Sequence, residues 1–237
     1  MNPPTLYGYL GQNGRVSTVN RATVTQSLSV SFTVGLYGIA FGAASIAAGF
    51  SLIQTCLLSL VTFSGASQFA VIGVMGAGGS ALSGIATASL LGTRNMLYAM
   101  RMAPLLQVRG LKKFVAAEVT IDESTGVAIG QEDLGVDAMK HGFWLTGIGV
   151  YIFWNFFTVL GALGAQAMGN PSAWGLDAAV PAAFLGLVWP RLLGKFERTL
   201  AASSLILAIL LSPILGAGLP IISTALLAVF FGWNKRS

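Results

Sequence analysis

Long apolar runs limit how this chain can fold. Several of them approach or exceed the ~20 residues that a helix needs to cross the hydrocarbon core of a bilayer. Of the 237 residues, 54% are hydrophobic and only 9% are charged, whereas a soluble domain carries about 25% charged residues. Inside lipid the backbone must satisfy its own hydrogen bonds, which a helix does. The sequence therefore predicts an all-α, polytopic integral membrane protein and makes a soluble globular enzyme a poor fit.

Hydropathy places seven candidate membrane segments along the chain. They are predicted at 28–48, 51–75, 81–100, 142–168, 178–190, 199–213 and 218–233. The fifth and the sixth are too short for a perpendicular crossing unless they are tilted, broken or locally unwound. Residues 1–27 are polar and rich in glycine, and we predict a flexible cytoplasmic N-terminal segment there. The rest, residues 28–237, is predicted to form one transmembrane domain.

Basic residues test this count, because Lys and Arg concentrate on the cytoplasmic side of membrane proteins. They lie just outside the apolar runs, at Arg101–Lys113, Lys140, Arg191–Arg198 and Lys235–Arg236. From Lys140 onward the crossings place all of them on one side. Before it, three full spans would put the Arg101–Lys113 loop outside if Arg15 and Arg21 are inside. Either one segment within 28–100 is not a simple span, or the N-terminus lies outside.

The net charge of +5 follows from the same distribution. The basic residues flank membrane segments instead of forming one stripe, so positive-inside topology accounts for them. We expect the lipid bilayer as the surrounding medium and no nucleic acid as a partner.

A helix break is predicted in the second segment, where residues 62–73 read TFSGASQFAVIG. Ser64, Gly65, Ser67 and Gln68 are polar or helix-weakening residues in close succession. A re-entrant or discontinuous helix there would not count as a full crossing, so all the basic loops would lie on the cytoplasmic side. Such irregular backbone is tolerated at membrane depth only where protein or a water-filled cavity covers it, so the break marks a candidate pathway. For the amide of Gln68, simple helix packing is the alternative.

Small residues and a faint repeat add two structural expectations. Residues 115 apart coincide at Phe69 and Phe184 and at three other pairs, which agrees with an inverted repeat of the kind found in many polytopic membrane proteins. Glycines recur in the first segment, directly after it and in the fourth segment, and small residues at such spacings allow close helix contact. They are Gly38, Gly42, Gly49, Gly161 and Gly164.

Arg94 lies inside an apolar run, and a charge there needs a physical reason. On a helix, Thr87, Arg94 and Tyr98 fall close to one face. A charged residue at a helix centre costs about 2.5–3.5 kcal/mol on insertion scales, so its presence implies a buried partner or an aqueous cavity. Alternatively, Arg94 lies near enough to the cytoplasmic end for its guanidinium to reach the headgroups.

Six of the eight acidic residues fall within twenty positions, and they include the natural partners of Arg94. They are Glu118, Asp122, Glu123, Glu132, Asp133 and Asp137. Residues 114–131 are too polar for a lipid-facing span and too apolar for a solvated loop. This segment is either an amphipathic interfacial helix or an element that brings Asp122 or Glu123 toward Arg94, where a carboxylate would be able to titrate. For the last three acids we favour a solvated surface.

Catalytic and metal-binding motifs are missing from the sequence. There is one histidine, His141, and no cluster of His, Cys or acid at metal-ligand spacing. A G-x-S-x-G elbow, a glycine-rich phosphate loop and a Walker sequence are likewise absent. The lone Cys56 cannot form an internal disulfide. We expect no enzymatic activity, no metal and no cofactor.

Five segments resemble the AzlC family, the large subunit of branched-chain amino-acid exporters. They are GIAFGAASIAAGFS (38–51), SLVTFSGASQFAVIG (59–73), LLGTRNMLYAMRMAP (90–104), TIDESTGVA (120–128) and GLDAAVPAAFLGLVWP (175–190). The resemblance covers nearly the whole chain after about residue 28. It implies a transporter that exports leucine, isoleucine, valine or similar apolar amino acids across a bacterial inner membrane, coupled to the proton gradient. It also implies a small partner subunit of the AzlD type. The alternative is a scaffold or assembly subunit that transports nothing.

The family motifs, carried over position by position, give a candidate set for substrate binding or coupling. The motifs point to Ser64, Gly65, Gln68, Arg94, Asp122 and Glu123, and we add Asn95, which follows the arginine, to the set. One departure concerns the arginine: the family usually shows an Asn two residues before it and a His or similar residue just after it, where this chain has Gly92 and Asn95. Exposed helix amides or Arg94 would suit the carboxylate of a zwitterionic amino acid, and an acidic or carbonyl group its ammonium.

Overall fold

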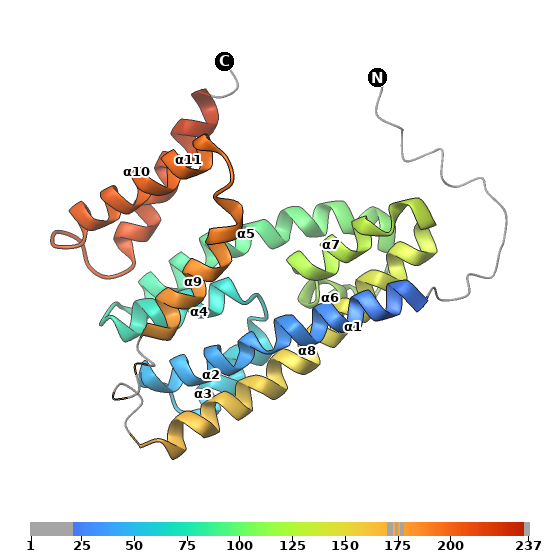
Figure 1. Ribbon diagram of the computed structural model, residues 1–237, viewed down its shortest axis with the longest axis horizontal. Helices are drawn as coiled ribbons and strands as arrows, with labels where there is room; N and C mark the ends of the chain where they lie inside the picture. Colours follow the sequence, from blue (N-terminus) through green and yellow to red (C-terminus); the bar gives the residue numbers. More distant parts are fainter. Residues whose placement is uncertain (1–20, 170–172, 174, 176–177, 235–237) are drawn as a thin grey trace. The chain divides into compact units, whose positions relative to one another are not determined.

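The chain is all-helical. The computed structural model describes residues 21–169, 173, 175 and 178–234, and no strand occurs among them (Figure 1). The helices are α1 (Arg21–Gly35), α2 (Tyr37–Ala47), α3 (Leu52–Val61), α4 (Ala66–Gly76), α5 (Ala81–Leu106), α6 (Lys112–Glu118), α7 (Asp122–Gly130), η2 (Glu132–Leu134), α8 (Val136–Ala167), α9 (Ala179–Val188), η5 (Trp189–Arg191), α10 (Lys195–Leu211) and α11 (Leu219–Asn234). The predicted all-α class is confirmed.

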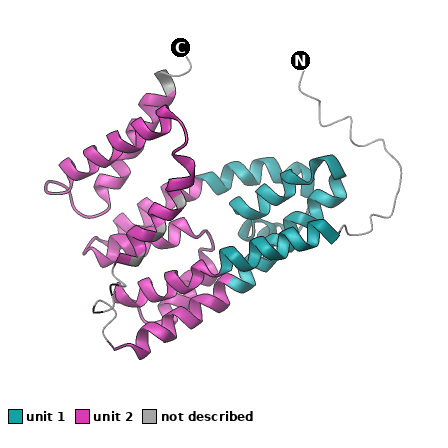
Figure 2. Ribbon diagram, in the orientation of Figure 1, with its two compact units in different colours: residues 1–35, 94–153 teal, residues 36–93, 154–237 magenta. Residues whose placement is uncertain are grey.

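Two compact units divide the chain (Figure 2). Unit 1 comprises residues 1–35 and 94–153, and unit 2 comprises residues 36–93 and 154–237. The long helices α5 and α8 each contribute to both units. The expectation of one domain over 28–237 stays a prediction.

Two helical stretches are long and apolar enough to cross a membrane by length and composition. Within the described part of the chain they are Arg21–Ala47, with 27 residues, and Val136–Ala167, with 32 residues. The apolar helices α3 and α4 are much shorter, at 10 and 11 residues. The count of seven membrane segments stays a prediction.

Helix α1 begins seven residues before the predicted start of the first segment. Residues 21–27, which we predicted to be flexible, are therefore helical, while residues 1–20 lie outside the described part of the chain. Thr23, Ser27 and Ser31 recur every four residues on the buried face of α1. These hydroxyl residues lower the local hydropathy although they are buried. Hydropathy therefore predicts a start of the first segment that lies after the start of the helix.

In unit 1, α1 and the first part of α8 run in the same direction at close range. The Ser31 hydroxyl donates to the Thr146 carbonyl at 3.1 Å, and a Cβ on Gly149 would lie 2.5 Å from that hydroxyl. Further along both helices, a Cβ on Gly35 would overlap the Cβ of Phe153. Since the residue numbers rise together, the two helices are parallel. Beside them, α5 to α8 enclose an apolar core of Met102, Leu105, Leu106, Ala116, Val119, Ala128 and Phe143.

In unit 2, glycines join α2 to the second part of α8. A Cβ on Gly42 would overlap the carbonyl oxygen of Thr158, and a Cβ on Gly161 would overlap that of Ile39. Gly38 lies equally close to α8, whereas a Cβ added to Gly49 or Gly164 would have nothing within 4 Å. The predicted close contacts are therefore confirmed at Gly38, Gly42 and Gly161 only, because the other two glycines lie where no neighbouring helix comes near.

The C-terminal helices α10 and α11 pack on each other, with the rings of Phe196 and Phe231 6.3 Å apart. No residue of α10 is buried. The outward side chains are large and apolar, and they include Leu205, Ile209, Leu226 and Phe230. A surface of this kind suits hydrocarbon better than water.

Candidate functional site

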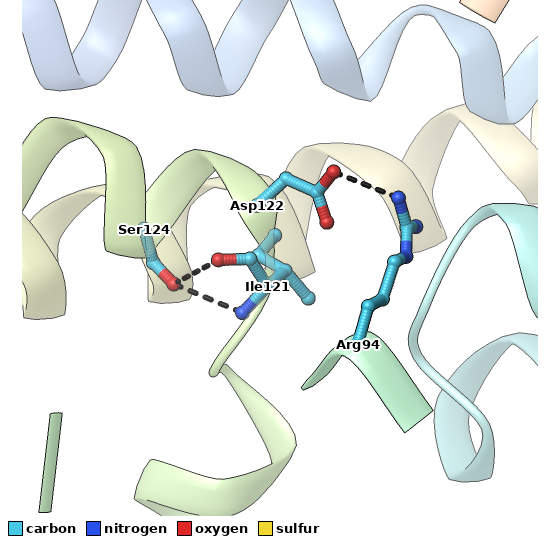
Figure 3. Close-up of polar contacts among 4 residues, drawn as sticks. All are labelled: Arg94, Ile121, Asp122 and Ser124. Atoms are coloured by element: carbon cyan, nitrogen blue, oxygen red, sulfur yellow. Dashed lines mark hydrogen bonds and ion pairs between the residues drawn. The ribbon is translucent and has the colours of Figure 1, made fainter. Parts of the chain in front are cut away.

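Arg94 is paired with Asp122 in unit 1. Nη1 of Arg94 donates to Oδ2 of Asp122 at 2.7 Å, a short charge-assisted hydrogen bond (Figure 3). The two side chains are 31% and 20% exposed, so both are largely withdrawn from the surface. We expected either a buried partner for Arg94 or a position close to the headgroups, and the structure shows the partner. The segment 114–131 brings Asp122 to Arg94, which was one of the two alternatives for that segment.

A break between α6 and α7 positions the carboxylate of Asp122. The Ser124 hydroxyl accepts the Ile121 N–H at 3.1 Å and lies 3.2 Å from the Ile121 carbonyl oxygen (Figure 3). It also donates to the Val119 carbonyl at 2.7 Å, which links the segment between the two helices to the start of α7. Asp122 then lies in the first turn of α7. The positive end of the helix dipole favours a carboxylate there. One short helix therefore both orients Asp122 and places its carboxylate at the positive end of the helix dipole.

The other end of α7 is held by amide and hydroxyl groups. Gln131, directly after α7, accepts a hydrogen bond from the Thr23 hydroxyl at 2.9 Å and donates to Oε1 of Gln26 at 2.7 Å. Both partners belong to α1. Helix α7 is thus fastened at its start by Ser124 and at its end by Gln131.

The remaining acidic and amide residues of unit 1 differ in burial. Glu123 lies next to Asp122 in the first turn of α7 and is half-buried. Asn95 follows Arg94 on α5, and its Oδ1 is buried without a hydrogen-bond partner among the described residues. The solvated surface that we predicted for Glu132, Asp133 and Asp137 is confirmed, since all three are exposed.

The predicted helix break is confirmed in unit 2. Helix α3 ends at Val61 and α4 begins at Ala66, with Ser64 and Gly65 in the irregular link. Gly65 has φ +57° and ψ −84° and begins α4 without a side-chain cap. The first N–H groups of a helix have no carbonyl partner within the helix, so the start of α4 presents donors and a positive dipole end.

Gln68 holds the break together. Its side chain is fully buried, and its Nε2 donates to the carbonyls of Leu58 at 3.2 Å and Ser59 at 3.1 Å, near the end of α3. The Leu58 carbonyl also accepts hydrogen bonds from the N–H and the hydroxyl of Thr62, whereas Ser59 is one of the last four residues of α3, whose carbonyls lack a partner within the helix. Its Oε1 is buried and accepts no hydrogen bond from the described residues. Gln68 therefore links the start of α4 to the end of α3, and its Oε1 remains available as an acceptor.

Trp154 is a residue of this region that the sequence did not single out. Its ring stacks on Phe41 at 6.0 Å between centroids and meets Phe69 edge-on at 6.4 Å. A Cβ on Gly65 would lie 3.7 Å from the same indole, so Trp154 borders the break. Its Nε1 is buried and donates to no acceptor in the described part of the chain. A tryptophan inside an apolar segment carries no local sequence signal for such a position.

Unit 1 thus groups Arg94, Asn95, Asp122 and Glu123, while Ser64, Gly65 and Gln68 belong to unit 2. Each group has its own chemistry. The first offers a pair of opposite charges that are in contact. The second offers the start of a helix, an amide oxygen and an indole N–H.

Replacing Gly65 by alanine is expected to lower the melting temperature in detergent by about 2–10 °C, from a strain of about 1–3 kcal/mol. The strain comes from the backbone, because a positive φ disfavours any residue with a Cβ, whereas the nearest atom at 3.7 Å leaves room for a methyl group. Gly186→Ala is the control, since Gly186 has an ordinary φ and open space around it. Equal melting temperatures for both variants would contradict this account of Gly65.

The two helical stretches long and apolar enough to cross a membrane agree with the helical membrane protein that the sequence predicted. The family comparison makes this specific: the AzlC family, described as AzlC protein, matches residues 29–168, which is more than half of the chain. The chain therefore belongs to the AzlC family, which is associated with branched-chain amino-acid transport. The match includes every candidate site residue and ends before α9. No curated protein and no solved structure matches the chain.

Proposed function

We propose that this chain is a multi-pass inner-membrane transporter that exports branched-chain or similar apolar amino acids, driven by protons. The observation that carries the proposal is the 2.7 Å pair of Arg94 with Asp122 in a chain of the AzlC family. Ionisable residues among membrane helices are costly, and where they persist they mark ion and substrate pathways.

The polar groups of unit 2 match the two charges of an amino acid. The start of α4 and the indole N–H of Trp154 are donors for its carboxylate, and Oε1 of Gln68 is an acceptor for its ammonium. Both side-chain atoms are buried and make no hydrogen bond within the described residues. A buried group that lacks a partner costs about 1–3 kcal/mol. Bound substrate would recover that cost, which favours a zwitterion at this break.

The ion pair supplies the coupling step. As a carboxylate, Asp122 holds the guanidinium of Arg94. When a proton adds to Asp122, a neutral O–H forms and the charge attraction to Arg94 is lost. Two arrangements of the pair, one charged and one protonated, thus link a proton to the position of α5 against α7.

Helix direction in unit 1 favours a re-entrant segment. Because α1 and α8 are parallel, two spans built on them require an odd number of crossings in the chain between them. Helix α5, with 26 residues, is about 39 Å long, enough for one crossing. Helices α3 and α4 are about 15–17 Å each, too short to cross singly. The pair α3–α4 then enters and leaves on one side, which keeps the basic loop after α5 on the same side as the start of α1.

A counterflow assay separates transport from a scaffold role. Liposomes loaded with unlabelled valine and carrying the protein, with or without a small AzlD-type partner subunit, are expected to accumulate labelled valine above protein-free liposomes. Accumulation that requires the partner would make the partner an obligatory subunit. A scaffold exchanges nothing, so background accumulation in both preparations would refute the proposal.

A further inference from the structure

A row of buried hydroxyl groups follows α1 in unit 1 and is not explained by the ion pair. Thr23, Ser27 and Ser31 are each at most 1% exposed and lie four residues apart on one face of the helix. Helices α7 and α8 both contact α1 and carry two more buried hydroxyl residues, Thr125 at 3% and Thr146 at 0% exposure. We call these five residues the hydroxyl seam.

The contacts of α1 place the seam between α7 and α8. At one end, Thr23 bonds to Gln131 after α7, and at the other, Ser31 bonds to the Thr146 carbonyl. Ser27 lies midway between these two contacts on the same face of α1. Its side chain therefore faces the space that α7 and α8 border.

Three hydroxyls of the seam are unsatisfied. Oγ of Ser27 and Oγ1 of Thr125 and Thr146 are buried without a hydrogen-bond partner in the described part of the chain. A helical Ser or Thr commonly bonds to the carbonyl four residues earlier, and Thr87 of α5 does so at 2.8 Å. Leaving such a group unpaired costs about 1–3 kcal/mol, and three of them on helices that pack on α1 or belong to it point to ordered water.

We infer that the hydroxyl seam holds a chain of ordered water molecules that leads to Asp122. A buried water needs two to four polar partners, and the three unpaired hydroxyls together with the Thr23 and Gln131 side chains provide them. Thr125 lies one helical turn after Asp122, on the same face of α7. At the other end, Gln131 bonds to Gln26, which is exposed near the start of α1.

Such a chain would carry protons. A proton that enters at Gln26 passes from water to water by breaking one O–H bond for each one that it forms, and it ends as the O–H of Asp122 opposite Arg94. No oxidant or reductant takes part. This role rests on the proposed proton-driven transport, whereas the water itself does not.

Cysteine labelling tests the water directly. In a Cys56→Ser background, Ser27→Cys in native membranes is expected to react with a small, charged methanethiosulfonate reagent, because water delivers the reagent and stabilises the thiolate. The matched control is Ala128→Cys, since Ala128 is equally buried at 0% exposure but lies in the apolar core of the same unit. Labelling of Ser27→Cys that is no faster than that of Ala128→Cys would overturn the inference.

A transport assay tests the role of the seam. The variant Ser27→Ala/Thr125→Val/Thr146→Val removes the three unpaired hydroxyls at similar side-chain volume. Its valine counterflow is expected to stay near wild type, because exchange requires no net proton movement, whereas efflux driven by a pH gradient falls by about tenfold or more. Unchanged gradient-driven efflux would overturn the proton path. Wild-type protein without counterflow would refute the proposed transport and this role with it, while the labelling still decides whether water is present.

Discussion

Cells that carry Arg94→Ala are expected to export valine no faster than cells without the protein, although the variant reaches the membrane in normal amounts. The substitution leaves the largely buried carboxylate of Asp122 without its guanidinium. A hydrogen bond to a charged group contributes about 1.5–3 kcal/mol, and partial exposure of both side chains favours the lower end. That loss is too small to prevent folding, but it removes one of the two states needed for coupling.

Two further variants make this result specific. Arg101→Ala removes an exposed positive charge from the same helix and is expected to retain at least about half of wild-type efflux, since exposed charges contribute little. The double variant Arg94→Ala/Asp122→Asn removes the negative charge of the Asp122 carboxylate as well, so its melting temperature is expected to recover while export stays absent. Efflux of valine at the wild-type rate by Arg94→Ala would remove the ion pair from the mechanism.

Replacing Gly161 by valine is expected to reduce the yield of monodisperse protein after detergent extraction by about fivefold or more. Any Cβ on Gly161 would overlap the Ile39 carbonyl oxygen and lie 2.7 Å from the Ile39 Cα. Both obstacles are backbone atoms, which no change of rotamer can move aside. Overpacking costs about 1–3 kcal/mol even where side chains adjust, and here α2 and α8 must separate.

Gly164→Val is the matched control for this prediction. Gly164 lies three residues further along α8 and has nothing within 4 Å of an added Cβ. Its yield is expected to equal that of the wild type, because valine at this position meets open space. The measurement is the area of the monomeric peak in size-exclusion chromatography at equal membrane input. A Gly161→Val yield equal to that of Gly164→Val would contradict the close contact of α2 with α8.

The sequence was sufficient to predict the elements whose cause is local. The break before α4 follows from Ser64 and Gly65, because glycine allows the positive φ that begins the new helix. The pairing of Arg94 with an acidic residue could be predicted because a charged side chain in an apolar run is energetically costly without a partner. The chain contains few acidic residues that could be this partner.

Features that depend on neighbouring helices could not be predicted in the same way. Gly161 and Gly164 are indistinguishable by type and setting in the sequence, yet only the first meets another backbone. Trp154 reads as one more apolar residue until the fold places its indole beside Gly65. The start of α1 could not be predicted from hydropathy, because Thr23 and Ser27 are polar residues that the fold nevertheless buries.

The fastening of α7 has a consequence for the behaviour of the protein in solutions of different ionic strength. Dissolved salt weakens the attraction between exposed charges over distances of about 10 Å at 0.1 M. The bonds of Ser124 and Gln131 that fix the two ends of α7 join uncharged groups, on which counterions have little effect. Concentrated electrolyte would thus leave both ends of α7 in place, and it would weaken the partly buried pair of Asp122 with Arg94 only slightly.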